Sequence, residues 1–150
     1  GAGDHARREE RLMRDLAAAT AMLLRQGRNL DRLSRGLTLV GALSVFLGPI
    51  PWLGVGLVLA GVAQSWFAFR VGFDAALFAA LGRGDGTLAS MDAALMALGL
   101  MPESKTGRDI TLRASGAKRL LVLQVVALLA QIALCVIAAG LTAMWNGAPV

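Results

Sequence analysis

The chain has 150 residues, of which 56% are hydrophobic and only 17% are charged, and its formal net charge is +5. A soluble domain has about 25% charged residues, whereas here all charged residues lie within 4–35 and 70–119, so that 36–69 and 120–150 have none. This distribution excludes an ordinary water-soluble domain, because the exposed face of a helix in water normally carries charges, and it predicts an all-α integral membrane protein.

The excess of basic residues is typical of membrane topology. Lys and Arg concentrate in the cytoplasmic flanks of membrane spans, and all 15 of them lie in segments that flank the two uncharged stretches. We therefore expect the lipid bilayer as a partner and no nucleic acid. The predicted location is a bacterial inner membrane, with several spans, the N-terminus in the cytoplasm and the C-terminus outside.

Residues 1–35 are predicted to form one long amphipathic helix on the cytoplasmic side. Its leucines, with Ala19 and Gln26 filling two positions, recur at alternating steps of three and four residues, which is the spacing of a heptad seam. The seam residues that we expect to bind a partner are Leu16, Leu23, Leu30 and Leu33. Two other interpretations remain: the stripe lies on anionic headgroups of the bilayer, or it packs against residues 70–118 of the same chain.

Residues 36–70 are predicted to form a helical hairpin in the membrane, with its turn at 48–51. Pro49 and Pro51 each remove an N–H donor and displace the preceding residue from helical geometry. Because hydrocarbon cannot satisfy the freed backbone groups, the turn should reach headgroups or water. The first arm has about 16 Å of uncharged helix, against roughly 30 Å of hydrocarbon. A full hairpin is favoured, and a re-entrant hairpin is the alternative.

The next segment, 71–118, is predicted to be a small helical insert at the cytoplasmic surface. A short helix within it has an apolar face that we expect to bind a partner, with burial against neighbouring helices as the alternative. That face consists of Met91, Leu95 and Leu98. Two acids near the apolar faces, Asp74 and Asp92, are expected to cap helices or to pair with Arg70 and Arg113.

Residues 119–145 are predicted to form a transmembrane helix, followed by an uncharged tail over 146–150. The helix runs for about 26 residues without a charge, where about 20 are enough to span a bilayer. Gln124 and Gln131 are seven residues apart and share one face. We expect that face to pack against the hairpin or a neighbouring subunit, because lipid would leave both amides unpaired.

These segments together predict three spans, formed by a hairpin and a C-terminal helix. Tryptophans and basic residues are expected at the two membrane–water interfaces. The predicted interfacial anchors are Trp52, Trp66 and Trp145. The residues expected at the membrane surface or on lipid headgroups are Arg32, Arg35, Arg70, Arg113, Lys118 and Arg119. The residues expected to form polar contacts between helices are Gln64, Gln124 and Gln131.

The sequence predicts neither catalysis nor a metal or cofactor site. His5 is the only histidine and Cys135 the only cysteine, so the usual set of zinc ligands cannot be assembled. There is no tyrosine, and the carboxylates of 71–118 are too scattered to suggest the paired acids of a hydrolase. We therefore expect that the protein is not an enzyme and has no cofactor.

Amphipathic cytoplasmic helices without a catalytic constellation favour a non-catalytic accessory or scaffold subunit. Such a subunit would hold a membrane protein complex, or further copies of itself, at the membrane. The alternative is an oligomeric pore or holin-like channel in which the glutamines of the spans line a wet lumen. No ionisable residue lies in a predicted span, which argues against ion-coupled transport.

Overall fold

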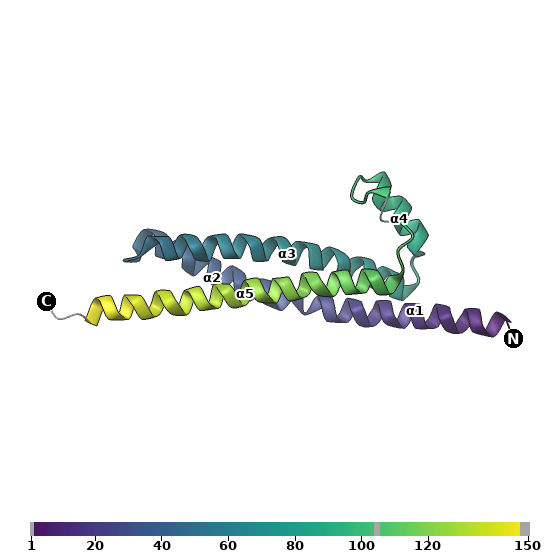
Figure 1. The fold of residues 1–150 in the computed structure, drawn as a ribbon, viewed down its shortest axis with the longest axis horizontal. Coiled ribbons are helices and arrows are strands. Elements are labelled where there is room, and N and C mark those ends of the chain that lie inside the picture. Colours follow the sequence, from purple (N-terminus) through teal and green to yellow (C-terminus); the bar gives the residue numbers. More distant parts are fainter. Residues whose placement is uncertain (1, 104–105, 148–150) are drawn as a thin grey trace. The chain divides into compact units, whose positions relative to one another are not determined.

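A computed structural model describes residues 2–103 and 106–147, and these residues contain helices and no strands. The helices are α1 (Ala2–Arg25), α2 (Gly27–Leu47), α3 (Pro51–Arg83), α4 (Leu88–Ala97) and α5 (Ile110–Gly147), as labelled in Figure 1. The all-α prediction is confirmed. Of the described helices, α3 and α5 are long and apolar enough to cross a membrane.

The single helix predicted over residues 1–35 is instead two helices, which meet at Gln26. Gln26 keeps helical dihedral angles, with φ −62° and ψ −27°, and its carbonyl accepts a hydrogen bond from the Asn29 N–H at 3.1 Å. The interruption therefore changes the local hydrogen-bond pattern without a loop. Gly27, a poor helix former, follows directly, and α2 then continues to Leu47.

The break between α2 and α3 falls at Gly48, Pro49 and Ile50. Gly48 is extended, with φ −86° and ψ 154°, which is the geometry that a following proline favours. Its N–H still bonds to the Ser44 carbonyl at 3.0 Å. Pro51 opens α3, a position where its missing N–H is not needed.

Helix boundaries further along the chain differ from the predicted segments. Helix α3 runs through Arg70 to Arg83 without a break, although the sequence predicts a boundary between hairpin and insert at 70. Helix α5 likewise begins at Ile110 and ends at Gly147, beyond the predicted limits 119 and 145. The residues at each predicted boundary include no helix breaker. One continuous helix can therefore run through each of them. The rest of the predicted tail, 148–150, lies outside the described residues.

The chain divides into two compact units, which are described separately. Unit 1 comprises residues 1–25 and 71–119, and unit 2 comprises residues 26–70 and 120–150. Unit 1 thus contains α1, the end of α3, α4 and the start of α5. Unit 2 contains α2, the first part of α3 and the remainder of α5.

Unit 2 is held together by small residues. Helices α2 and α3 run antiparallel and approach closely at two glycines, Gly41 and Gly54. A methyl group at Gly54 would lie 2.6 Å from the Gly41 carbonyl oxygen and 2.7 Å from the Val45 nitrogen. Close glycine contacts of this kind are common between helices in membranes, where packing replaces the hydrophobic effect as the driving force.

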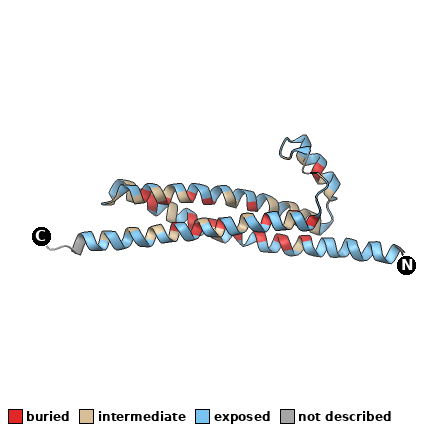
Figure 2. Ribbon diagram, in the orientation of Figure 1, coloured by how far each residue is buried: buried red, intermediate tan, exposed pale blue. Residues whose placement is uncertain are grey.

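The large apolar side chains of unit 2 point outward. Figure 2 shows the buried positions as narrow red patches on otherwise exposed helices. Only 22% of the most apolar window of α3 and 17% of that of α5 is buried. The exposed residues include Leu39, Leu43, Phe46, Leu59, Val62, Phe69, Val126, Leu129, Val136 and Ile137. A core helix of a water-soluble protein would show the opposite arrangement, with these residues inside.

Unit 1 has a more ordinary apolar core. Its buried apolar residues are Ala17, Ala21 and Leu24 of α1, Val71, Ala75 and Phe78 of α3, and Ile110 and Ala117 of α5. The alanines let α1 approach α3 closely, since a methyl group at Gly82 would lie 3.1 Å from the Ala18 nitrogen. Helix α4 starts at a capping box in which Thr87 and Ser90 bond to each other's backbone N–H.

Candidate functional site

A hydrogen-bonded polar cluster of unit 2 surrounds Gln131, whose side chain is fully buried. Its Oε1 accepts a hydrogen bond from Ser34 Oγ at 2.6 Å. Its Nε2 lies within hydrogen-bond distance of three acceptors: the Ser34 carbonyl at 3.2 Å, Thr38 Oγ1 at 3.0 Å and the Leu57 carbonyl at 3.3 Å. Gln131 therefore joins α5 to both α2 and α3.

The other two predicted glutamines are also fully buried but have fewer partners. Gln124 Nε2 donates to the Gly27 carbonyl at 2.7 Å, while its Oε1 has no partner in the protein. Neither side-chain polar atom of Gln64 has one. All three glutamines have 0% exposure within one chain, so a lumen between subunits would require them to leave these positions.

Asp31 is a charged residue of unit 2 that the sequence analysis did not single out. Its exposed fraction is 8%, and its Oδ2 pairs with Arg35 at 2.6 Å. It belongs to the buried seam of α2, whose members are four, three and seven residues apart. That seam consists of Gly27, Asp31, Ser34 and Gly41. This seam lies beside the leucine stripe. Because its residues are polar or small, a pattern of large apolar residues does not predict it.

The leucine stripe that the sequence offers as a partner surface is mostly exposed. On α1, the inward face carries Ala17, Ala21 and Leu24, while Leu12, Leu16, Met22 and Leu23 are exposed. Leu33 of α2 is exposed and Leu30 half-buried. On α4, Met91 and Leu95 are half-buried, and Leu98, just past the helix end, is 71% exposed. Small residues pack α1 inward, which leaves its large apolar residues available.

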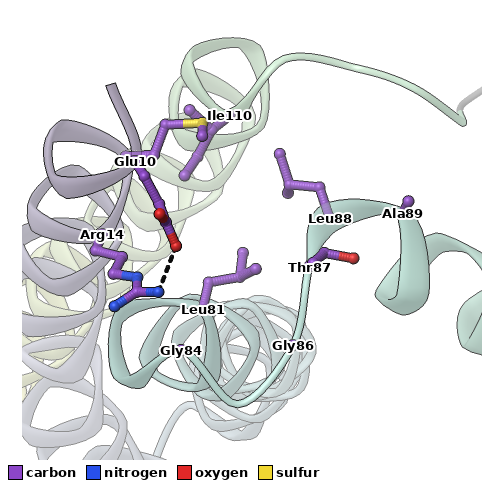
Figure 3. A pocket seen from close by; sticks show the side chains of 10 residues that line it. Glu10, Arg14, Leu81, Gly84, Gly86, Thr87, Leu88, Ala89 and Ile110 are labelled. Carbon is purple, nitrogen blue, oxygen red and sulfur yellow. Dashed lines mark hydrogen bonds and ion pairs between the residues drawn. The ribbon is translucent and has the colours of Figure 1, made fainter. Parts of the chain in front are cut away.

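A groove of about 400 Å³ lies in unit 1 next to this surface, between α1, the end of α3, and the starts of α4 and α5 (Figure 3). Its apolar walls are Met13, Leu81, Leu88, Ala89 and Ile110. An ion pair between Glu10 and Arg14, 2.5 Å apart, lies at one side. The volume is within the range of small-molecule and anchor-residue pockets.

The sequence does not predict this groove, because its residues come from three separated segments, 10–14, 81–89 and 110. The nearest local signal is the glycine-rich turn after α3. Gly84 adopts φ +78°, a conformation that favours glycine. A Cβ there would lie 3.5 Å from the Arg14 guanidinium carbon, an ordinary contact, so the positive φ is what favours glycine at this position.

The predicted basic and aromatic residues fall into two groups. The first group is Arg113 alone, whose side chain is bonded within the protein. It donates to both carboxylate oxygens of Asp92, at 2.6 and 2.7 Å. This pair confirms the expected partnership of Asp92 and Arg113. Asp92 also accepts from the Gly107 N–H at 3.0 Å, so this one carboxylate of α4 holds both the loop that follows α4 and, through Arg113, the start of α5.

The remaining residues of that set are exposed on the surface. The Arg70 guanidinium lies 5.4 Å from the centroid of the Trp66 ring, within cation–π distance. Trp52, Trp66 and Trp145 are all exposed, as are Arg32, Arg35, Lys118 and Arg119. Side chains of these types suit a headgroup region, where indole rings and cations find both apolar and polar surroundings.

One acidic group at the start of α5 has a perturbed pKa. The Thr111 hydroxyl, together with the backbone N–H groups of Ile110 and Thr111, holds the pKa of Asp109 below its usual range, against a smaller opposing effect of desolvation. This is the geometry of a helix N-cap. Within residues 2–103 and 106–147, no three His, Cys, Asp or Glu side chains come together as a metal site.

Comparison of the chain with known protein families, curated proteins and solved structures gives no match.

Proposed function

We propose that the protein is a non-catalytic membrane subunit that holds a partner protein at the cytoplasmic surface of a bacterial inner membrane. The membrane assignment is supported by the inverted packing of unit 2. Its small and polar residues are inside, and its large apolar residues face outward. Water would make this arrangement unfavourable, while lipid solvates it.

In this proposal α2 is the third span, paired with α3 as a full hairpin. Its 21 residues correspond to about 32 Å of helix, close to the hydrocarbon thickness. The charges in its first half need not face lipid: Asp31 is buried and paired with Arg35, and exposed arginines there can extend toward headgroups. The N-terminus would be cytoplasmic and the C-terminus outside.

Cysteine labelling tests this threading. In a Cys135→Ala background, single cysteines at Ile50 and at Asn146 should react with a membrane-impermeant thiol reagent added from outside. A cysteine at Arg11 should react only after the membrane is opened. If Ile50 and Asn146 are both protected from the outside reagent, the three-span threading is wrong.

The partner-binding part of the proposal rests on one observation, the exposed apolar face of α1. Leu12 and Met22 are each 67% exposed and Leu23 is 47% exposed, in a segment that also carries many charges. Exposed apolar surface of this kind commonly marks an interaction site. The groove beside Met13 could receive an apolar anchor side chain of the partner, as interface pockets often do.

The test is the mass of the complex extracted in a mild detergent. Wild-type protein should elute with a partner, or as a defined homo-oligomer, at fixed stoichiometry. Leu12→Ser combined with Leu23→Ser should release the partner, whereas the matched surface change Arg11→Ser combined with Arg25→Ser should retain it. A wild-type protein that is monomeric and free of any partner would contradict the proposal.

A further inference from the structure

Four buried polar atoms of unit 2 have no hydrogen-bond partner in the protein. They are Asp31 Oδ1, Gln64 Nε2, Gln64 Oε1 and Gln124 Oε1. Gln64 and Gln124 have 0% exposure and Asp31 has 8%. Buried polar groups are nearly always satisfied by protein or by ordered water, so this concentration within one unit needs a physical explanation.

Helix register places the three residues close together along the bundle. Helices α2 and α5 run parallel with a constant offset, because Gln124 bonds to Gly27 and Gln131 bonds to Ser34. The same offset makes Asp31 level with Leu128, one turn from Gln124. Asp31 and the free oxygen of Gln124 therefore lie within about one turn of each other along the bundle.

Gln64 joins these two residues from α3. Gln131 bonds to the Leu57 carbonyl, and α3 runs antiparallel to α2 and hence to α5. Gln124 precedes Gln131 by two turns, so it lies level with the residue two turns beyond Leu57. That residue is Gln64. The four atoms without partners therefore come from three helices and lie within about one turn of the same depth.

The numbers of hydrogen-bond donors and acceptors among the four atoms indicate which ligand they can bind. Three of the atoms are oxygens that accept, one of them in a carboxylate, and the fourth is an amide nitrogen that donates. A bare cation could bind the oxygens but could not accept from Gln64 Nε2. Water donates and accepts, and buried waters typically make about three hydrogen bonds to groups of this kind. We propose that Asp31, Gln64 and Gln124 form a binding site for buried water inside the three-helix core.

Toward the 48–50 turn, the side chain of Gln131 is fully bonded, and the described residues have no further buried side-chain polar atom without a partner. Asp31 is paired with Arg35, one helical turn further along α2, whose side chain is 72% exposed. The connection to solvent therefore runs through the side of the bundle. The proposed site is blind, in contrast to a pore through the bundle. It does not depend on the identity of the partner protein.

Solid-state NMR of the wild-type protein in lipid bilayers tests the site directly. The chain has four glutamines, at 26, 64, 124 and 131, so magnetisation transfer from water to each side-chain amide can be compared. Transfer to Gln64 should build up nearly as fast as to the exposed Gln26, and several-fold faster than to Gln131, which has only protein partners. Transfer to Gln64 as slow as to Gln131 would overturn the proposal.

A second arm separates water from a bound cation. Replacing sodium and potassium in the buffer with the bulky N-methylglucamine should leave the water transfer and the side-chain carbonyl shifts of Gln64 and Gln124 unchanged. Shifts that move with the inorganic cation would show that the oxygens coordinate the ion directly, and the water site would then be rejected.

Discussion

Ser34 and Gln131 exchange two hydrogen bonds across unit 2, although they are 97 residues apart in the sequence. The Ser34 hydroxyl donates to Oε1 at 2.6 Å, and Nε2 donates to the Ser34 carbonyl at 3.2 Å. Reciprocal bonding of this kind fixes both the rotation and the axial register of α5 on α2. It also fixes which residues of the two helices share a layer.

Replacing this glutamine by leucine should destabilise the bundle measurably. Gln131→Leu removes the acceptor of the Ser34 hydroxyl and the donor to the Thr38 hydroxyl, so we expect a loss of roughly 1–3 kcal/mol in the free energy of unfolding. Gln124→Leu removes a single bond to Gly27 and should cost less. Reversible unfolding in mixed micelles measures both. An equal or larger loss for Gln124→Leu would be inconsistent with the hydrogen-bond pattern.

The contact between α2 and α3 depends on the absence of a side chain at Gly54. Gly54→Ala puts a methyl group 2.6–2.7 Å from backbone atoms of α2, which cannot move independently of their helix. We expect a loss of about 1–3 kcal/mol, as for overpacked cores. Gly72→Ala in the same helix meets no atom within 4 Å and should be neutral or slightly stabilising. Thermal unfolding of both variants in detergent provides the comparison.

How much of this fold the sequence predicts depends on the physical signal that each element leaves. Paired prolines cannot continue a helix, so the break at 48–50 is predictable. The long uncharged stretches likewise predict the apolar helices. The continuation of α3 past Arg70 is not predictable in this way, because a change in charge marks an interface with water and leaves helix propensity unchanged.

The buried face of each helix is harder to predict from the sequence than the position of the helix. Leucine spacing draws attention to Leu16 and Leu23, yet α1 packs through Ala17 and Ala21. Small residues allow closer approach of backbones, and periodicity of large apolar residues does not report them. The polar partners of Gln124 and Gln131 on α2 are 97 residues away in the sequence, so only the assembled helices identify them.

The ion pair between Asp92 and Arg113 should control the order of the loop that follows α4. The side chains are 6% and 19% exposed, and removing one partner of a buried pair typically costs about 3–5 kcal/mol. In Arg113→Ala we expect that loss as local opening of the loop, seen as faster amide hydrogen exchange at Gly107 and in the first turn of α5. Arg108→Ala, which keeps its backbone acceptor for Arg113, is the matched control. Unchanged exchange in Arg113→Ala would mean that the pair does not hold the loop.

The first turn of α5 should loosen in acid. The pKa of Asp109 is lowered, chiefly by the Thr111 hydroxyl. A carboxyl whose pKa is lowered in the folded state stabilises that state above its unfolded pKa, near 3.9, and this contribution disappears as the pH falls through the folded value. Thr111→Val should raise the pKa of Asp109 toward its usual range. Thr106→Val, whose hydroxyl bonds instead to the Glu103 carbonyl, should leave it unchanged. A carboxyl-carbon NMR titration of both variants decides the point.

Site-specific photo-crosslinking in native membranes tests most directly whether α1 holds a partner. A photoreactive residue at Leu23 should give a discrete protein adduct, because this position faces outward on the apolar side of α1. The same residue at Arg25, which is also exposed but lies on another face of the helix, should give little or none. Lipid adducts alone at Leu23, or equal protein adducts at both positions, would contradict the proposed role.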